Sequence, residues 1–232
     1  MTATPVPQVL ALVDDAALAR RVLEMSSAIA RQLQRPLEVV YVESLPALVA
    51  AALPFARVLA HGGAQWLPLA PQDVERGYRV QEARLRELTE SITLRHTVHW
   101  SMRVVRGVLP QAAFELREQS DLVFVDSAAG MPLGAALGAP FGAPVGRSRE
   151  APRSRPVITV LADASAAGRQ AQRVAQQVAQ ALGGVLNVRQ AETGAAPAAT
   201  VTAGRCDLLV LPRSLAAPGM LATLVQPTLI VG

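Results

Sequence analysis

Aspartate residues directly follow two of the apolar runs in this chain. Asp14 and Asp15 follow the run 9–13, and Asp126 follows the run 122–125. A carboxylate at the end of a buried strand can accept hydrogen bonds from a ribose or a base. Aspartate is also a favoured N-cap for a following helix. We prefer the cap for Asp14 and for its later counterpart Asp163, and the sequence leaves the ligand interpretation open.

A glycine-rich segment follows Asp126 and invites a second kind of chemistry. Its five glycines recur every four residues: Gly130, Gly134, Gly138, Gly142 and Gly146. Backbone N–H groups in a glycine-rich loop can surround a phosphate. Prolines lie between these glycines and argue against a regular helix. The composition is also typical of a flexible loop, which is the interpretation we prefer.

Other residue types argue against side-chain catalysis. All 22 basic residues are arginine, so a Walker lysine and a Schiff-base lysine are excluded. His96 and His99 would face opposite sides of a strand, with no third ligand nearby, so no metal site is expected. Cys206 is the single cysteine, which fits a reducing cytoplasm. No hydrolase motif is present, and we expect no enzymatic activity.

Charge and hydropathy exclude two classes of partner. Residues 1–150 hold 15 arginines and 15 acidic residues, and residues 151–232 hold 7 and 3. These arginines are scattered and no aromatic side chains interleave them, so no nucleic-acid partner is expected. The apolar stretch 45–70 is broken by Pro54 and Arg57 and is not a continuous membrane span. It is either a partner-binding surface or a helix that covers the sheet.

An internal repeat organises these residues. Residues 9–39 and 158–188 align without a gap at an offset of 149, each as an apolar run, a helical pattern and a second apolar run. The periodicities predict strands at 8–13, 37–43, 98–105, 121–126, 157–162, 185–189, 207–211 and 227–231. They predict helices at 16–33, 73–94, 109–119, 165–182 and, short, near 197–204.

The repeat predicts an α/β fold with two doubly wound parallel-sheet units in tandem. The first covers residues 1–150 and carries an insertion at 45–72; the second covers 151–232 and is shortened. The later strands 121–125 and 207–211 align at an offset of 86, so the second unit has lost 63 residues. We expect the two units to pack as an internal pseudo-dimer, because each half alone is small.

The order of these segments resembles the universal stress protein family in its tandem form. The phrases that carry the resemblance are VLALVDD, VVYVES, VVRGVLPQAAFELREQSDLVFVD and the closing QPTLIVG. It covers nearly the whole first unit apart from 45–70, and a reduced second unit. The resemblance implies an adenine-nucleotide α-hydrolase-like fold.

The resemblance also implies a place for a nucleotide. Nucleotide-binding members carry Gly-x2-Gly-x9-Gly-Ser/Thr after the fourth strand, and Asp14 and Val42 match positions that hold the adenine nucleotide. Here Asp126 stands where the first glycine would be, and no Gly-Ser or Gly-Thr pair closes the loop. The candidate nucleotide residues are Asp14, Asp15, Val42, Gly130, Gly134 and Gly138. Pro212 takes the first glycine position in the second unit.

We therefore expect a cytoplasmic regulatory or interaction protein of the universal stress type, with a degenerate nucleotide site, no cofactor and no metal. Its partner would be another protein or a second copy of the chain. One alternative is a stress protein that binds ATP or AMP, with slow ATP hydrolysis. Another is a soluble accessory of a membrane transporter, which would use residues 45–70.

Overall fold

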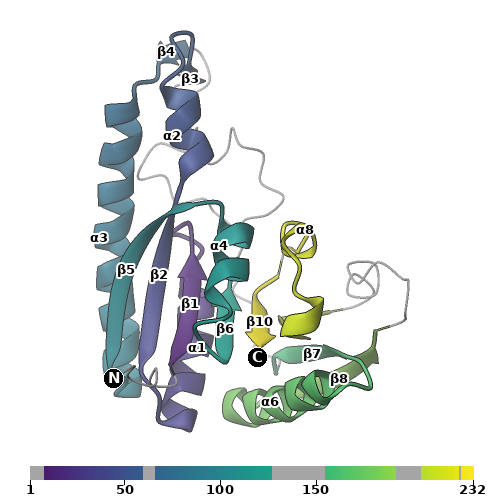
Figure 1. Ribbon diagram of the computed structural model, residues 1–232. Coiled ribbons are helices and arrows are strands. Elements are labelled where there is room, and N and C mark those ends of the chain that lie inside the picture. Colours follow the sequence, from purple (N-terminus) through teal and green to yellow (C-terminus); the bar gives the residue numbers. More distant parts are fainter. Residues whose placement is uncertain (1–7, 60–65, 127–154, 192–204, 225) are drawn as a thin grey trace, which may run out of the picture.

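The fold is built on an eight-stranded mixed sheet with helices on both faces (Figure 1). The computed structural model describes residues 8–59, 66–126, 155–191, 205–224 and 226–232. The strands of the sheet are β1 (Val9–Val13), β2 (Leu37–Ser44), β5 (Trp100–Gly107), β6 (Leu122–Val125), β7 (Val157–Ala162), β8 (Val185–Gln190), β9 (Leu208–Pro212) and β10 (Thr228–Val231). Their spatial order is β5-β2-β1-β6-β10-β9-β7-β8.

The helices are α1 (Arg20–Leu33), α2 (Leu45–Ala51), α3 (Pro71–His96), α4 (Leu109–Leu116), α6 (Ala166–Leu182) and α8 (Pro218–Leu221), with a short 3₁₀ helix at Arg213–Leu215. Four of the helices, α1, α3, α4 and α6, match predicted helices, whereas α2, α8 and the 3₁₀ helix were not predicted. The start of α1 differs from the prediction of 16, because residues 16–19 form turns. The short helix predicted near 197–204 lies outside the described residues.

The sheet separates two apolar cores, because successive strand residues face opposite sides. Val9, Ala11 and Val13 of β1 face a core to which α1, α3 and α6 contribute. Leu10 and Leu12 face a second core to which α4 and α8 contribute. Helices on both faces explain why β1 is apolar at every position. The predicted doubly wound α/β class is confirmed.

Strand direction changes once, at the centre of the sheet. β6 and β10 are antiparallel, whereas every other neighbouring pair in this sheet is parallel. The order β2-β1-β6 recurs as β8-β7-β9, so strands from both parts of the chain form one continuous sheet. The division into units 1–150 and 151–232 stays a prediction. One consequence is observed directly: carboxyl ends of β1 and β6 lie at one edge, and those of β7 and β9 at the opposite edge.

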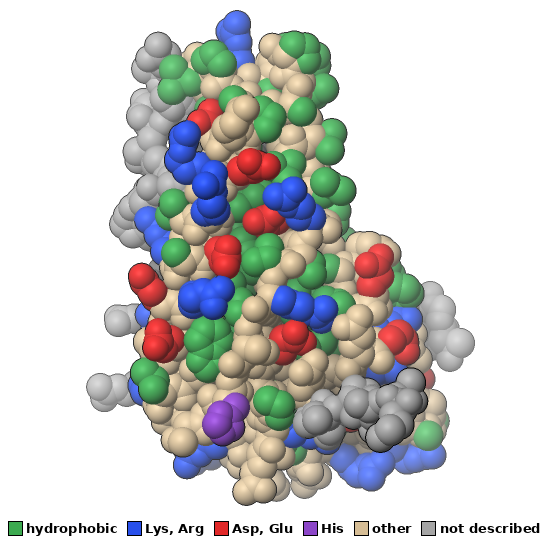
Figure 2. Space-filling model, turned by 60° about the vertical axis from the view of Figure 1, so that its left-hand side comes forward, with side chains coloured by type: hydrophobic (Ala, Val, Ile, Leu, Met, Phe, Trp, Pro, Cys, Tyr) green, Lys and Arg blue, Asp and Glu red, His purple; other side chains and the backbone are tan. Residues whose placement is uncertain are grey.

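Residues 45–59 and 66–72, the described part of the insertion, form a projection beyond the sheet (Figure 1). α2 packs against the first turns of α3, and β3 (Arg57–Leu59) pairs with β4 (Trp66–Pro68) as a two-stranded hairpin. Ala47, Ala51 and Val74 form a small core that is separate from the two main ones. The insertion is therefore not a helix that covers the sheet. In Figure 2 this projection is the narrower upper part of the molecule, above the wider body.

The edge strand β5 confirms the prediction of a half-buried strand at the end of the sheet. Trp100 and Met102 pack against the core, and Ser101 is exposed. Among the described residues, no helix is long and apolar enough to cross a membrane.

Candidate functional site

Two predicted carboxylates meet at the carboxyl ends of neighbouring strands. Asp14 directly follows β1 and Asp126 directly follows β6, and these two strands are paired in parallel. The backbone N–H of Asp126 donates to the Leu12 carbonyl oxygen at 3.2 Å, so the ladder continues to the last residue. Doubly wound sheets bind ligands beyond the carboxyl ends of their strands. This edge, defined by Asp14, Asp126 and Val42, is the candidate site.

Burial changes the acidity of both carboxyl groups. The pKa of Asp14 is raised to about 6, mainly by burial and in addition by the nearby charges of Asp15 and Asp126. Burial also raises the pKa of Asp126 to about 6, while the Arg21 guanidinium lowers it. Desolvation disfavours a charged carboxylate, which explains the direction of both shifts. At neutral pH the edge still carries negative charge, which attracts hydrogen-bond donors and repels phosphate.

Val42 of β2 lies beside Asp14. The register pairs Val13 of β1 with Tyr41 of β2, so the next residues, Asp14 and Val42, are also neighbours. The Val42 side chain is buried in the core on the α4 side. It is 2% exposed, so its side chain packs inside the protein and presents no surface to a ligand.

The predicted helix cap at Asp14 is wrong. α1 begins at Arg20, and its N-cap is Ala19, which makes no side-chain cap. The Asp15 carboxylate instead accepts from the backbone N–H of Ala17 at 2.7 Å and stabilises the turn that precedes the helix. The turns at 16–19 separate Asp14 from the first helical N–H groups.

Asp163, the repeat counterpart of Asp14, has a structural role at the opposite edge. Its carboxylate accepts from the backbone N–H of Ser165 at 3.1 Å and from the Ser165 hydroxyl. These hydrogen bonds hold the pKa of Asp163 below its usual value. The N-cap of α6 is Ser165, which accepts from the Gly168 N–H at 3.0 Å. Asp163 thus orients the cap instead of being the cap that we predicted.

An arginine occupies the carboxyl end of β9. Arg213 follows Pro212, the last residue of the strand, and its guanidinium donates to the Ser120 carbonyl oxygen at 3.1 Å. It also pairs with Glu118 at 3.2 Å. This edge of the second segment is therefore used for contact with the first.

The remaining sequence candidates divide into described and undescribed residues. Gly130, Gly134 and Gly138 lie outside the described residues. His96 ends α3 and His99 precedes β5, so the two do not share a strand as we had assumed. No group of three metal-ligating side chains occurs among the described residues. Burial raises the pKa of the Cys206 thiol, which favours the protonated, unreactive form.

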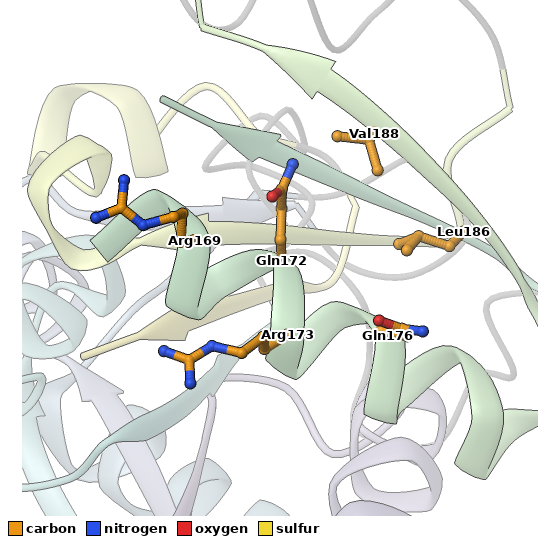
Figure 3. Close-up of a pocket in the computed structure, with 6 residues that line it drawn as sticks. All are labelled: Arg169, Gln172, Arg173, Gln176, Leu186 and Val188. Atoms are coloured by element: carbon orange, nitrogen blue, oxygen red, sulfur yellow. The ribbon is translucent and has the colours of Figure 1, made fainter. Parts of the chain in front are cut away.

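The sequence did not indicate a hollow that lies between α6 and β8. It has a volume of about 530 Å³ and is lined by Arg169, Gln172, Arg173 and Gln176 of α6 and Leu186 and Val188 of β8. Figure 3 shows the four α6 side chains beside the two apolar side chains of β8. No described strand covers β8, which ends the sheet.

The repeat explains why this hollow exists. At the offset of 149, Gln176 and Val188 correspond to Ser27 and Val39, which are fully buried. In the first segment α3 packs against α1, and β5 covers the edge of β2. Val188 is 46% exposed because nothing described takes the place of α3 and β5 beside it. A comparison of the two copies could have predicted an uncovered surface here.

Comparisons with known proteins give similarity at the level of structure. No family model matches the chain, and no curated protein matches it. Among solved structures, it is similar to a universal stress protein from Archaeoglobus fulgidus DSM 4304. The identity is 10% and the TM-score is 0.46, over 96% of this chain and 95% of that chain. The similarity concerns the general course of an α/β chain and carries no functional residue from one protein to the other.

Proposed function

We propose that this chain is a cytoplasmic, non-catalytic interaction protein of the universal stress type, and that its strand-end edge has lost phosphate binding. The observation that carries the proposal is the pair of partly buried carboxyl groups, Asp14 and Asp126, on adjacent strands. Both keep negative charge at neutral pH where a nucleotide would place its own anionic groups. Two like charges about 4 Å apart repel by roughly 4 kcal/mol near a protein surface.

The rival proposal is adenine-nucleotide binding, with slow hydrolysis, at the same edge. One observation favours it: the register brings Asp14 and Val42 side by side at the carboxyl ends of β1 and β2. A carboxylate there could accept hydrogen bonds from a ribose. The first proposal says that the edge no longer binds phosphate, and the second says that it does. A measurement of ATP binding therefore distinguishes them.

Isothermal titration with magnesium and ATP tests the proposal directly. We expect no binding in the micromolar range by the wild-type chain. Asp126→Gly removes the charge and places glycine where the resemblance expects it, so this variant should bind ATP more tightly than the wild type. Asp163→Asn, at the opposite edge, is the matched control and should leave ATP binding unchanged.

Two outcomes would overturn this proposal. One is a micromolar dissociation constant for the wild type that is lost in Asp14→Ala, which would establish the rival nucleotide site. The other is ATP hydrolysis by the wild type that Asp14→Ala abolishes. The proposed partner is another protein or a second copy of the chain, and sedimentation velocity over a concentration series measures the second case.

A further inference from the structure

Exposed apolar side chains gather on the projection formed by α2, β3, β4 and the start of α3. Thirteen large apolar side chains are exposed among the described residues, and six of them lie between positions 45 and 67. These six, which we call the tip cluster, are Leu45, Val49, Leu53, Phe55, Trp66 and Leu67. Contiguous apolar surface of this kind marks a place of contact with another molecule.

The helical part of the tip cluster is a continuous stripe. Leu45, Val49 and Leu53 follow one another at four-residue steps, so they lie on one side of α2 and its end. The other side of α2 holds Ala47 and Ala51, which pack toward α3. The stripe is therefore not the packing face of α2, and its exposure does not come from a poorly formed core.

The hairpin adds aromatic side chains to the stripe. Phe55 is 74% exposed just before β3, and Trp66 is 61% exposed in β4. Tryptophan is enriched where a protein meets the interface of a bilayer, because its ring is apolar and its N–H is polar. These are the two most exposed side chains of the tip cluster.

The segment from position 45 to position 72 carries charge of one sign. No acidic residue occurs from position 45 to position 72, and Arg57 is the single Asp, Glu, Lys or Arg there. Arg57 is exposed and makes no ion pair within the described part of the chain. The acidic residues that flank the segment are both paired: Glu43 with Arg106 at 2.9 Å, and Asp73 with Arg76 at 3.0 Å.

The shape of the projection favours a partner with a broad surface over a peptide that would bind in a groove. The projection stands out from the body of the molecule, with hydrophobic side chains at its top and along its margin (Figure 2). The hollow between α6 and β8 has no lining residue on the projection. A convex apolar tip can enter the headgroup region of a bilayer without a complementary partner.

We propose that the tip cluster docks this protein onto an anionic lipid bilayer. Phe55, Trp66 and the α2 stripe would enter the interface, and Arg57 would contact anionic headgroups. The proposal is independent of the nucleotide question. It also differs from a role as a transporter accessory, because the protein would bind vesicles that contain no protein.

Vesicle binding by the full chain tests the proposal. The probes are vesicles of phosphatidylcholine alone and of phosphatidylcholine mixed with phosphatidylserine, and the readouts are co-sedimentation and tryptophan emission. We expect binding to the mixed vesicles, with a blue shift as Trp66 leaves water. Trp66→Phe should remove the emission shift, because the other tryptophan, Trp100, packs against the core at the sheet edge. The variant should still bind, because phenylalanine keeps an apolar ring at position 66.

Three variants separate apolar insertion from charge. The double variant Phe55→Ser, Trp66→Ser should weaken binding at least tenfold, since each side chain loses its transfer from water. Arg57→Glu should weaken binding to the mixed vesicles about fivefold or more and affect the neutral vesicles less. Leu94→Ser is the matched control, because Leu94 is 73% exposed and lies near the other end of α3, and it should bind like the wild type.

Several results would overturn the proposal. One is no binding of the wild type to either kind of vesicle. Another is equal binding by the wild type and the Phe55→Ser, Trp66→Ser variant while circular dichroism shows both folded. A third is concentration-dependent self-association that the double variant abolishes, without vesicle binding, since the tip cluster would then be a protein interface.

Discussion

Arg21 of α1 holds Asp207 at the start of β9. The Arg21 Nη2 atom lies 2.6 Å from the Asp207 carbonyl oxygen and 2.9 Å from its Oδ1. Asp207 also accepts from the backbone N–H of Val157 at 2.9 Å, so it ties α1 to two strands of the second segment. The Arg21 charge also lowers the pKa of Asp126 at the candidate site. One guanidinium therefore connects the junction between the segments with the strand-end edge.

Replacement of Arg21 should affect both places. We expect Arg21→Gln to lower the free energy of unfolding by about 1 kcal/mol, a value reduced by the exposure of the pair. The pKa of Asp126 should rise above about 6, because the lowering charge is gone. Urea unfolding and carboxyl-carbon NMR titration measure the two effects. Arg20→Gln is the control, since Arg20 pairs with Glu24 at 3.7 Å on the surface; equal effects of both variants would refute the prediction.

Stability should fall as the pH rises through the pKa of the partly buried carboxyl groups. The pKa of Asp126 is raised from 3.8 to about 6, so the folded chain binds this proton more tightly than the unfolded chain. Asp126→Asn should therefore raise the free energy of unfolding by about 1–3 kcal/mol above about pH 7, with no difference below about pH 4. Denaturant unfolding across this range measures the change.

The control variant for this prediction, Asp163→Asn, should change the free energy of unfolding in the opposite direction. The pKa of Asp163 is lowered by its hydrogen bonds with Ser165, so its charged form stabilises the fold at neutral pH. Asp163→Asn should destabilise the protein at neutral pH, and the loss should disappear as the pH falls through the lowered folded-state pKa. The same sign for Asp126→Asn and Asp163→Asn would contradict the assignment of burial as the cause at Asp126.

Gly168 should not tolerate a side chain, although it lies in a helix. A Cβ atom there would lie 2.3 Å from the Asp163 carbonyl oxygen and 2.4 Å from its Oδ1. Alanine is usually favoured over glycine in a helix by up to about 1 kcal/mol, but here the overlap with backbone decides the sign. We expect Gly168→Ala to destabilise the protein by about 1–3 kcal/mol. Thermal unfolding compares it with Gly107→Ala, where a Cβ meets nothing within 4 Å and the melting temperature should hardly change.

Tyr78 anchors the projection to the sheet. Its hydroxyl donates to the Ser44 carbonyl oxygen at 2.9 Å, and its ring meets Tyr41 edge to face at 6.4 Å between centroids. We expect Tyr78→Phe to cost about 0.5–1.5 kcal/mol, because the ring contact stays and the hydrogen bond is lost. Hydrogen exchange should increase in α2 and hardly change in α6. Faster exchange throughout the molecule would show that the hydrogen bond has no local role.

Much of the fold could be predicted because helices and strands depend on local patterns. The apolar run 9–13 predicted β1, and the stripe through Val22, Met25 and Ile29 predicted α1. Part of the candidate site followed as well, because Asp14, Val42 and Asp126 each end or flank a predicted strand. The projection was predicted only as an insertion, since its broken apolar pattern is compatible with several structures.

The sequence by itself determined the strands, the helices and the internal repeat, because apolar periodicity records which side of each element is buried. Tertiary structure decided how those elements meet. The antiparallel pairing of β6 with β10 places Asp14 and Asp163 at opposite edges of one sheet, so two equivalent residues have different surroundings. Tertiary structure also leaves the side chains of the tip cluster exposed. Both outcomes depend on contacts between residues far apart in the chain, which no local pattern encodes.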